Sequence, residues 1–132
     1  QNRRAKVLDG GSAFDIGSTG EMTISCKVKI PVGNYYYPAI VSKRASFSGG
    51  VVGWVFFLEA NYWMVNIGQT SLGNRQIRGH VIADGQWHTL TVVIRKEGAA
   101  RNVYTYTDGV LYNTGISAAT SPYGITLKLQ FK

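Results

Sequence analysis

Apolar and polar residues alternate at every second position in three separate stretches of this chain. In residues 22–30 the apolar positions are Met22, Ile24, Cys26, Val28 and Ile30, with polar residues between them. Residues 88–95 and 125–131 repeat the same period. Successive side chains of a β-strand point to opposite sides, so each stretch predicts a strand with one buried and one solvent-facing side. This pattern is typical of antiparallel sheets.

Turn signals rich in glycine separate many other short strand-forming segments. The clearest is Asp108-Gly109, which lies between two such segments and predicts a tight type I′ hairpin. No segment shows the 3.6-residue period of a helix. We therefore predict an all-β fold of about ten strands, in which two antiparallel sheets pack as a β-sandwich or jelly roll. The remaining predicted strands are residues 13–16, 39–43, 53–59, 62–67, 76–81, 104–107 and 110–112.

The length and composition fit one folded domain. The chain has 132 residues, of which 45% are hydrophobic and 16% charged, and this excludes disorder and a coiled coil. No repeat or linker is visible, so residues 1–132 are expected to form a single β-sandwich domain. The longest apolar run is too short for a membrane-spanning helix. The single cysteine, Cys26, excludes an intrachain disulfide and is predicted to be a buried structural residue.

The charge balance is strongly basic, with 14 Lys and Arg against 7 Asp and Glu, a net charge of +7. This excess favours an acidic partner, such as a sulfated or uronic polysaccharide, a nucleic acid or an anionic surface, although it serves solubility equally well. The basic residues are scattered and form no block, which argues against a specific nucleic-acid partner.

Six segments, in order over residues 13–116, resemble one family. Residues 84–92 (DGQWHTLTV) resemble the "Asp-Gly-x-Trp-His" motif of laminin-G-like, concanavalin A-like jelly-roll domains. The resemblance implies the jelly-roll fold and a range of functions: sugar binding, adhesion, protein contacts and modules beside catalytic domains. The usual closing strand is missing after Gly115, so either residues 125–131 replace it or the chain is a piece of a longer protein. The other five segments are residues 14–17, 22–29, 40–43, 53–58 and 106–111.

The sequence offers no catalytic constellation. The Glu-x-Asp-x-x-Glu pattern of the related glucanases is absent, and Glu59 is interpreted as a carboxylate at a strand end. His80 and His88 have no partner nucleophile or orienting acid in the sequence, and His88 is expected to make a structural hydrogen bond. We predict that the protein is not an enzyme.

Calcium is the one cofactor that the sequence leaves open. Many members of the laminin-G-like family, which this chain resembles, bind calcium near an edge of the sandwich. In this chain Asp9, Asp15 or Asp84 could contribute ligands. Asp84 precedes a glycine, however, so turn chemistry explains it equally well.

Aromatic residues are the strongest functional signal, because a rigid exposed ring stacks on the flat face of a sugar at small entropy cost. Tyr35-Tyr36-Tyr37 is predicted to lie between strands, where three consecutive rings cannot all face a core. Trp54 and Trp87 are expected instead to fill the sandwich or to cover its rim. The predicted glycan contacts are the rings of Tyr35, Tyr36 and Trp63 with polar groups from Asn34, Asn61, Asn74, Arg75 and Arg78.

Two functions remain. The first is a non-catalytic, lectin-like module that binds a glycan, including an acidic one, on a secreted, cell-surface or virion protein. The second is a structural, assembly or adhesion domain that contacts other chains through its termini, where Arg3, Arg4 and Lys6 form a basic tail.

Overall fold

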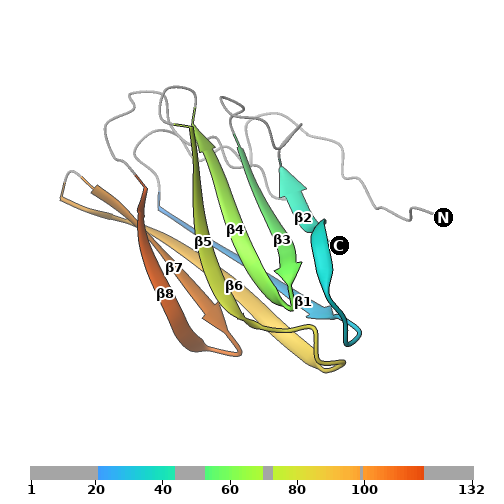
Figure 1. Cartoon of the computed structure of the whole chain (residues 1–132). Helices are drawn as coiled ribbons and strands as arrows, with labels where there is room; N and C mark the ends of the chain where they lie inside the picture. Colours follow the sequence, from blue (N-terminus) through green and yellow to red (C-terminus); the bar gives the residue numbers. More distant parts are fainter. Residues whose placement is uncertain (1–20, 44–52, 70–72, 99, 118–132) are drawn as a thin grey trace, which may run out of the picture.

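The chain forms two antiparallel four-stranded sheets that pack face to face (Figure 1). The computed structural model describes residues 21–43, 53–69, 73–98 and 100–117. Within these ranges the predicted all-β sandwich is confirmed, while the strands expected at residues 13–16 and 125–131 lie outside them. Sheet A has the order β1-β6-β7-β8 and consists of β1 (Met22–Lys29), β6 (Trp87–Glu97), β7 (Ala100–Thr107) and β8 (Val110–Ser117). Sheet B has the order β2-β3-β4-β5 and consists of β2 (Tyr35–Lys43), β3 (Gly53–Ala60), β4 (Tyr62–Gln69) and β5 (Gly73–Val81).

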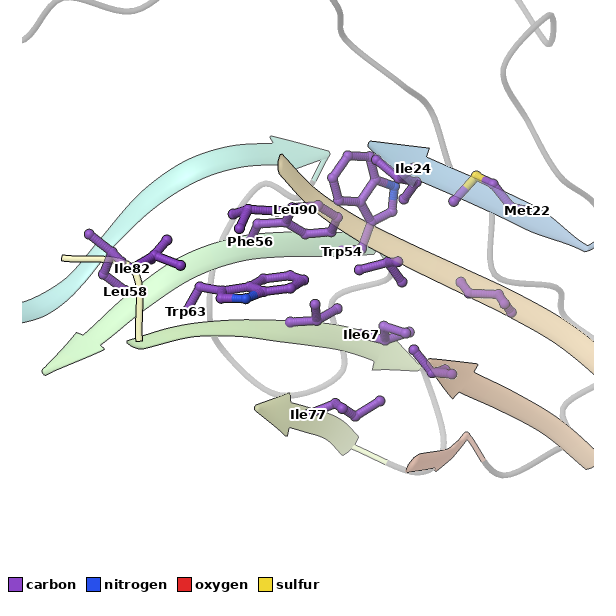
Figure 2. Close-up of a cluster of buried hydrophobic side chains, with 14 residues drawn as sticks. Met22, Ile24, Trp54, Phe56, Leu58, Trp63, Ile67, Ile77, Ile82 and Leu90 are labelled. Carbon is purple, nitrogen blue, oxygen red and sulfur yellow. The ribbon is translucent and has the colours of Figure 1, made fainter. Parts of the chain in front are cut away.

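The main core lies between the two sheets. Trp54, Phe56 and Trp63 of sheet B form a continuous run of rings, with centroids 5.3 and 5.5 Å apart (Figure 2). Such tilted aromatic pairs add to the apolar burial that holds the sheets together. Sheet A meets this run with buried aliphatic side chains, including Ile24 and Leu90.

A second, smaller cluster lies on the other face of sheet B. Val55, Phe57 and Met64 are buried there, and the ring of Tyr37 lies 6.0 Å from that of Phe57. Strands β3 and β4 are thus apolar on both faces. This explains why residues 53–58 read as a continuous apolar run instead of an alternation. The cluster is a packed apolar layer on the outer face of sheet B.

The three consecutive tyrosines belong to strand β2, which corrects the prediction that they lie between strands. Tyr35 pairs with Ala60 and Tyr36 with Glu59, and the register then shifts twice before Val41. Tyr37 takes a positive φ of 58° at this irregularity. Strand β2 is an edge of sheet B, where bulges and Pro38 are tolerated because fewer ladder hydrogen bonds are needed.

The two tryptophans predicted to be buried have different environments. Trp54 is 1% exposed and fills the sandwich, whereas Trp87 is 60% exposed, so the expectation that Trp87 fills the sandwich was wrong. The alternation of β6 gives the reason. Leu90, Val92 and Ile94 face the core, which places Trp87 on the opposite, outer side of sheet A.

Two local predictions are confirmed. Asp108 and Gly109 have φ values of 52° and 79° and connect β7 to β8, as a type I′ turn requires. Cys26 packs against the main core, and burial raises the pKa of its thiol to about 11, which suits a structural residue. None of the described residues forms a helix long and apolar enough to cross a membrane.

Candidate functional site

Three side chains form a row across sheet B, one from each of three adjacent strands. Tyr36 of β2 is the register partner of Glu59 of β3, and Glu59 is the partner of Tyr62 of β4. Directly opposed residues share one face of a sheet, with Cβ atoms about 5 Å apart. A carboxylate therefore lies between two phenol rings, on the face opposite the main core. Tyr36 is 83% exposed, so this row is open to solvent.

Tyr37 and Arg78 extend this row at its two sides. The hydroxyl of Tyr37 donates a long hydrogen bond of 3.5 Å to Oε1 of Glu59, and the Tyr37 side chain is exposed. The guanidinium carbon of Arg78, on β5, lies 3.4 Å from the centroid of the Tyr62 ring. This stacking fixes the plane of the guanidinium and leaves its N–H groups at the edge to donate. We call Tyr36, Tyr37, Glu59, Tyr62 and Arg78 the row site.

The row site combines three kinds of recognition group on a rigid surface. The carboxylate of Glu59 can accept several hydrogen bonds, and the guanidinium of Arg78 can donate several. The exposed rings offer flat apolar area. One negative and one positive group lie within the same small patch, so the charges of these two residues balance.

Of the two adjacent tyrosines predicted to contact a ligand, Tyr36 is exposed on the outer face of sheet B, whereas Tyr35 has a structural role. Tyr35 is half-buried and packs against the main core. Its hydroxyl donates a 2.9 Å hydrogen bond to the carbonyl of Pro31, and its ring lies against Gly33, where an added Cβ would be only 3.1 Å from it.

The prediction that Trp63 contacts a ligand was wrong. Its side chain is 0% exposed, and Nε1 donates a 2.9 Å hydrogen bond to Oγ1 of Thr107 inside the sandwich. The residue lies next to Tyr62, which does reach the outer face. The sequence did not show which of Tyr62 and Trp63 faces the main core, because strand β4 is apolar on both sides.

The predicted polar residues divide into two groups. Arg78 belongs to the row site, and Asn61 is exposed in the β3–β4 hairpin beside it, with its carbonyl accepting from the N–H groups of Ile82 and Ala83 at 2.9 and 3.0 Å. Asn34 is exposed in the turn that precedes β2.

Asn74 and Arg75 lie at the other end of β5. Asn74 pairs with Gly68, which is six residues from Tyr62 along β4, or about 20 Å at the usual rise of a strand. The fold therefore separates these two backbone positions from the row site. Their side chains are outside the described part of the chain.

Sequence reasoning did not assign Tyr37, Glu59 and Tyr62 to a binding site. A signal for two of them was present, because Glu59 and Tyr62 flank the two-residue Ala60-Asn61 turn and must therefore oppose each other across a hairpin. The contribution of Tyr37 depends on the irregular register of β2, which no local pattern indicates.

His88 forms the structural contact predicted for it. Its Nδ1 lies 2.7 Å from Oδ2 of Asp108, and its Nε2 lies 3.0 Å from Oδ1 of Asp84. Partial burial alone would lower the pKa of His88, but the hydrogen bonds to Asp108 and Asp84 outweigh it and raise that pKa. The pKa of Asp84 is lowered by hydrogen bonds from the Gln86 N–H and from His88. The Asp108 pKa is lowered by the Thr89 N–H and by His88.

The calcium prediction gains no support from this arrangement. Asp84 is engaged by His88 and by its own turn, as turn chemistry suggested. Within the described ranges, no group of three or more His, Cys, Asp or Glu side chains could hold a metal ion. Asp9 and Asp15 lie outside those ranges.

Two antiparallel four-stranded sheets packed around an aromatic core define the class of antiparallel β-sandwiches. A laminin G-type family model, described as the concanavalin A-like lectin/glucanases superfamily, matches residues 8–127. The chain belongs to this superfamily. No curated protein and no solved structure matched the chain. Domains of this superfamily bind carbohydrate or contact other proteins, so the ligand must be argued from the site itself.

Proposed function

We propose that the protein is a non-catalytic, lectin-like module that binds a glycan at the row site. The observation that carries this proposal is the cross-strand register of Tyr36, Glu59 and Tyr62, which places a carboxylate between two rings on an exposed face. A sugar presents an apolar C–H face to such rings and hydroxyl groups to the carboxylate. The stacked guanidinium of Arg78 would donate to hydroxyl oxygens at the same time.

The exposure of the row site supports shallow binding to the end or the side of a glycan chain. Tyr36 and Tyr37 are 83% and 56% exposed, so their rings are free to cover a sugar without moving core residues. By analogy with other stacking platforms, each ring that serves as a true anchor contributes about 1–3 kcal/mol.

The carboxylates support binding without hydrolysis. Glycosidases place two carboxylates across one bond, about 5–9.5 Å apart. Glu59 is the carboxylate of the row site, whereas the other described acidic residues belong to sheet A, its turns and the residue that precedes β1. These are Glu21, Asp84, Glu97 and Asp108. A glycan partner would place the domain on a secreted, cell-surface or virion-borne protein, where glycans are displayed.

A glycan array at physiological salt, run with calcium and again with a chelator, tests the proposal. We expect binding confined to one sugar class, and we expect Tyr36→Ala and Glu59→Gln each to weaken it at least about fivefold. Tyr112→Ala is a matched control, because Tyr112 is an exposed tyrosine on sheet A. Silence of the array in both conditions, or equal affinities for all variants, would contradict the proposal.

A second function, protein contact in a larger assembly, is favoured by an apolar patch at the β5 and β8 edges. Val81, Val110, Leu111 and Tyr112 are all at least 42% exposed there, and the rings of His80 and Tyr112 meet with centroids 4.5 Å apart. Edge strands that expose apolar side chains are common docking surfaces. Light scattering over a range of concentrations tests this alternative, and a monomer throughout would contradict self-assembly.

A further inference from the structure

The outer face of sheet A has a different character from that of sheet B. The alternation of β1, β6 and β7 places Val92 and Val103 in the core and sends basic, aromatic and hydroxyl side chains outward. We call the strip of this face that follows β6 from Trp87 to Arg95 the basic stripe. At the usual rise of a strand it is about 27 Å long.

One end of the basic stripe is built around Trp87. Its ring is 60% exposed, and its register partner is Lys29 of β1. The ammonium group of Lys27 lies 5.9 Å from the centroid of the same ring. One cation therefore lies over a large exposed aromatic surface, and a second lysine occupies the opposed backbone position. Trp87 belongs to residues 84–92, the segment that resembles the family motif, and it is not part of the row site.

The other end repeats the combination of ring and cation. The guanidinium carbon of Arg95 lies 5.8 Å from the centroid of the Tyr104 ring, and Arg95 is exposed. Hydroxyl side chains occupy the strip between the two ends. Among them Ser25 and Thr91 are register partners whose hydroxyl oxygens are 3.0 Å apart.

The described side chains of the basic stripe include no carboxylate. Glu97 lies beyond Arg95 on β6, where its carboxylate accepts hydrogen bonds from Tyr104 and Asn102. The stripe thus carries its positive charges toward its two ends, from Lys27 and Lys29 at one and Arg95 at the other, with Glu97 bordering the Arg95 end. This contrasts with the row site, where Glu59 would repel a polyanion. The two faces therefore suit ligands of different charge.

We propose that the basic stripe is a second binding surface, independent of the row site, and that its ligand is a linear sulfated polysaccharide. Sulfate groups meet the lysine ammonium groups and the Arg95 guanidinium, which forks onto two oxygens. The rings of Trp87 and Tyr104 stack on sugar units near each end. The hydroxyl strip between them, around Ser25 and Thr91, hydrogen-bonds to the sugar units that connect the two ends.

The layout of the cations favours an extended chain over a membrane surface. An anionic membrane would be contacted at one end of the sheet, here by the exposed Trp87 and by the exposed Val32, which lies close to Gly85. In that case Arg95, at the far end of the stripe, would contribute little. A linear polyanion that lies along β6 requires both ends, so Arg95 distinguishes the two kinds of partner.

The test is calorimetric titration of the full chain with heparin, with desulfated heparin, which keeps its carboxylates but has no sulfate groups, as the matched probe. We expect Lys27→Glu/Lys29→Glu to weaken heparin binding at least about tenfold and to flatten its dependence on salt concentration. Arg95→Glu should weaken it several-fold, and Trp87→Ala should weaken it without changing the salt dependence. Lys96→Glu makes the same charge change on the neighbouring position of β6, whose side chain points away from the stripe, and should have little effect.

Three results would overturn the proposal: equal losses for Lys96→Glu and Arg95→Glu, equal affinity for desulfated heparin, or tighter binding to phosphatidylserine vesicles or single-stranded DNA than to heparin. Thermal melting of each variant verifies that it is folded. Glu59→Gln should leave heparin binding unchanged, so failure of the row site and failure of the basic stripe give different results.

Discussion

Nε1 of Trp63 in β4 donates a 2.9 Å hydrogen bond to Oγ1 of Thr107 in β7, inside the sandwich. The bond joins the two sheets, since β4 belongs to sheet B and β7 to sheet A. Trp63 is 0% and Thr107 6% exposed, so water cannot easily replace a lost partner. A buried polar group left without its partner costs about 1–3 kcal/mol.

Trp63→Phe should therefore lower the free energy of unfolding by about 2–4 kcal/mol, because it removes the donor and leaves a smaller ring. Thr107→Val removes the acceptor at nearly constant volume. Urea unfolding of both single variants and the double variant gives the coupling between the two residues. We expect the double variant to lose less than the sum of the single losses. Strictly additive losses would show that the bond contributes nothing.

The close approach of the Trp63 indole requires a glycine at position 79. A Cβ added at this position would lie 2.0 Å from Nε1 of Trp63, a distance that requires the indole or the strand to move. Gly79→Ala should destabilise the protein by about 1–3 kcal/mol or more. Gly98→Ala is the control, since its Cβ would meet nothing within 4 Å and only its φ of +64° is unfavourable. A lower melting temperature for Gly98→Ala than for Gly79→Ala would contradict this prediction.

The two faces of the sandwich differ in how far the sequence could predict them. In β1 and β6 the alternation, interrupted by Val93, fixes which side each residue faces, and the same phase that buries Leu90 and Val92 exposes Trp87. The prediction for Trp87 failed because a family motif was weighed above this period. The basic stripe could have been derived from the sequence, given the register of β1 against β6.

Sheet B offered no such signal. Residues 53–58 and 63–65 are buried on both faces, so the period of two disappears, and Trp63 could not be distinguished from Tyr62. In β2 the register shifts after Tyr36, and the faces of the three tyrosines depend on pairing with β3. The row site arises from these tertiary contacts. A single sequence contains the residues but not their register.

Tyr35 and Tyr36 are adjacent in sequence and should respond in opposite ways to mutation. Tyr35→Phe removes the hydrogen bond to the Pro31 carbonyl and should lower stability by about 0.5–1.5 kcal/mol. Tyr36→Ala removes a ring that is 83% exposed and should change stability by less than about 0.5 kcal/mol. Binding to the glycan identified on the array should follow the reverse order. Loss of binding in Tyr35→Phe, with binding retained in Tyr36→Ala, would contradict the proposal that the glycan binds at the row site.

His88 holds two turns together through its two nitrogens. Carboxylates can only accept hydrogen bonds, so contacts with Asp108 at 2.7 Å and Asp84 at 3.0 Å are both satisfied only when the imidazole carries two protons. Asp84 belongs to the turn before β6, and Asp108 to the hairpin between β7 and β8. The charged histidine therefore connects the ends of three strands of sheet A.

The stabilising effect of this contact should be confined to a window of pH. The pKa of His88 is raised above its ordinary value of 6.5, so its contribution is complete below that value and is lost as the pH rises through the raised pKa. The pKa values of Asp84 and Asp108 are lowered below 3.8, so their contribution is complete above that value and is lost as the pH falls through the lowered pKa values.

Between pH 3.8 and 6.5 the wild type should exceed His88→Gln most in melting temperature, because all three groups are then charged. The difference should shrink at alkaline pH, where the imidazole is neutral and can donate to only one carboxylate. NMR titration provides the second measurement, in which Asp84→Asn should move the His88 pKa back toward its ordinary value because one of the two charged acceptors is gone. A melting difference that is the same at every pH would mean that His88 contributes packing alone, without the ionic hydrogen bonds.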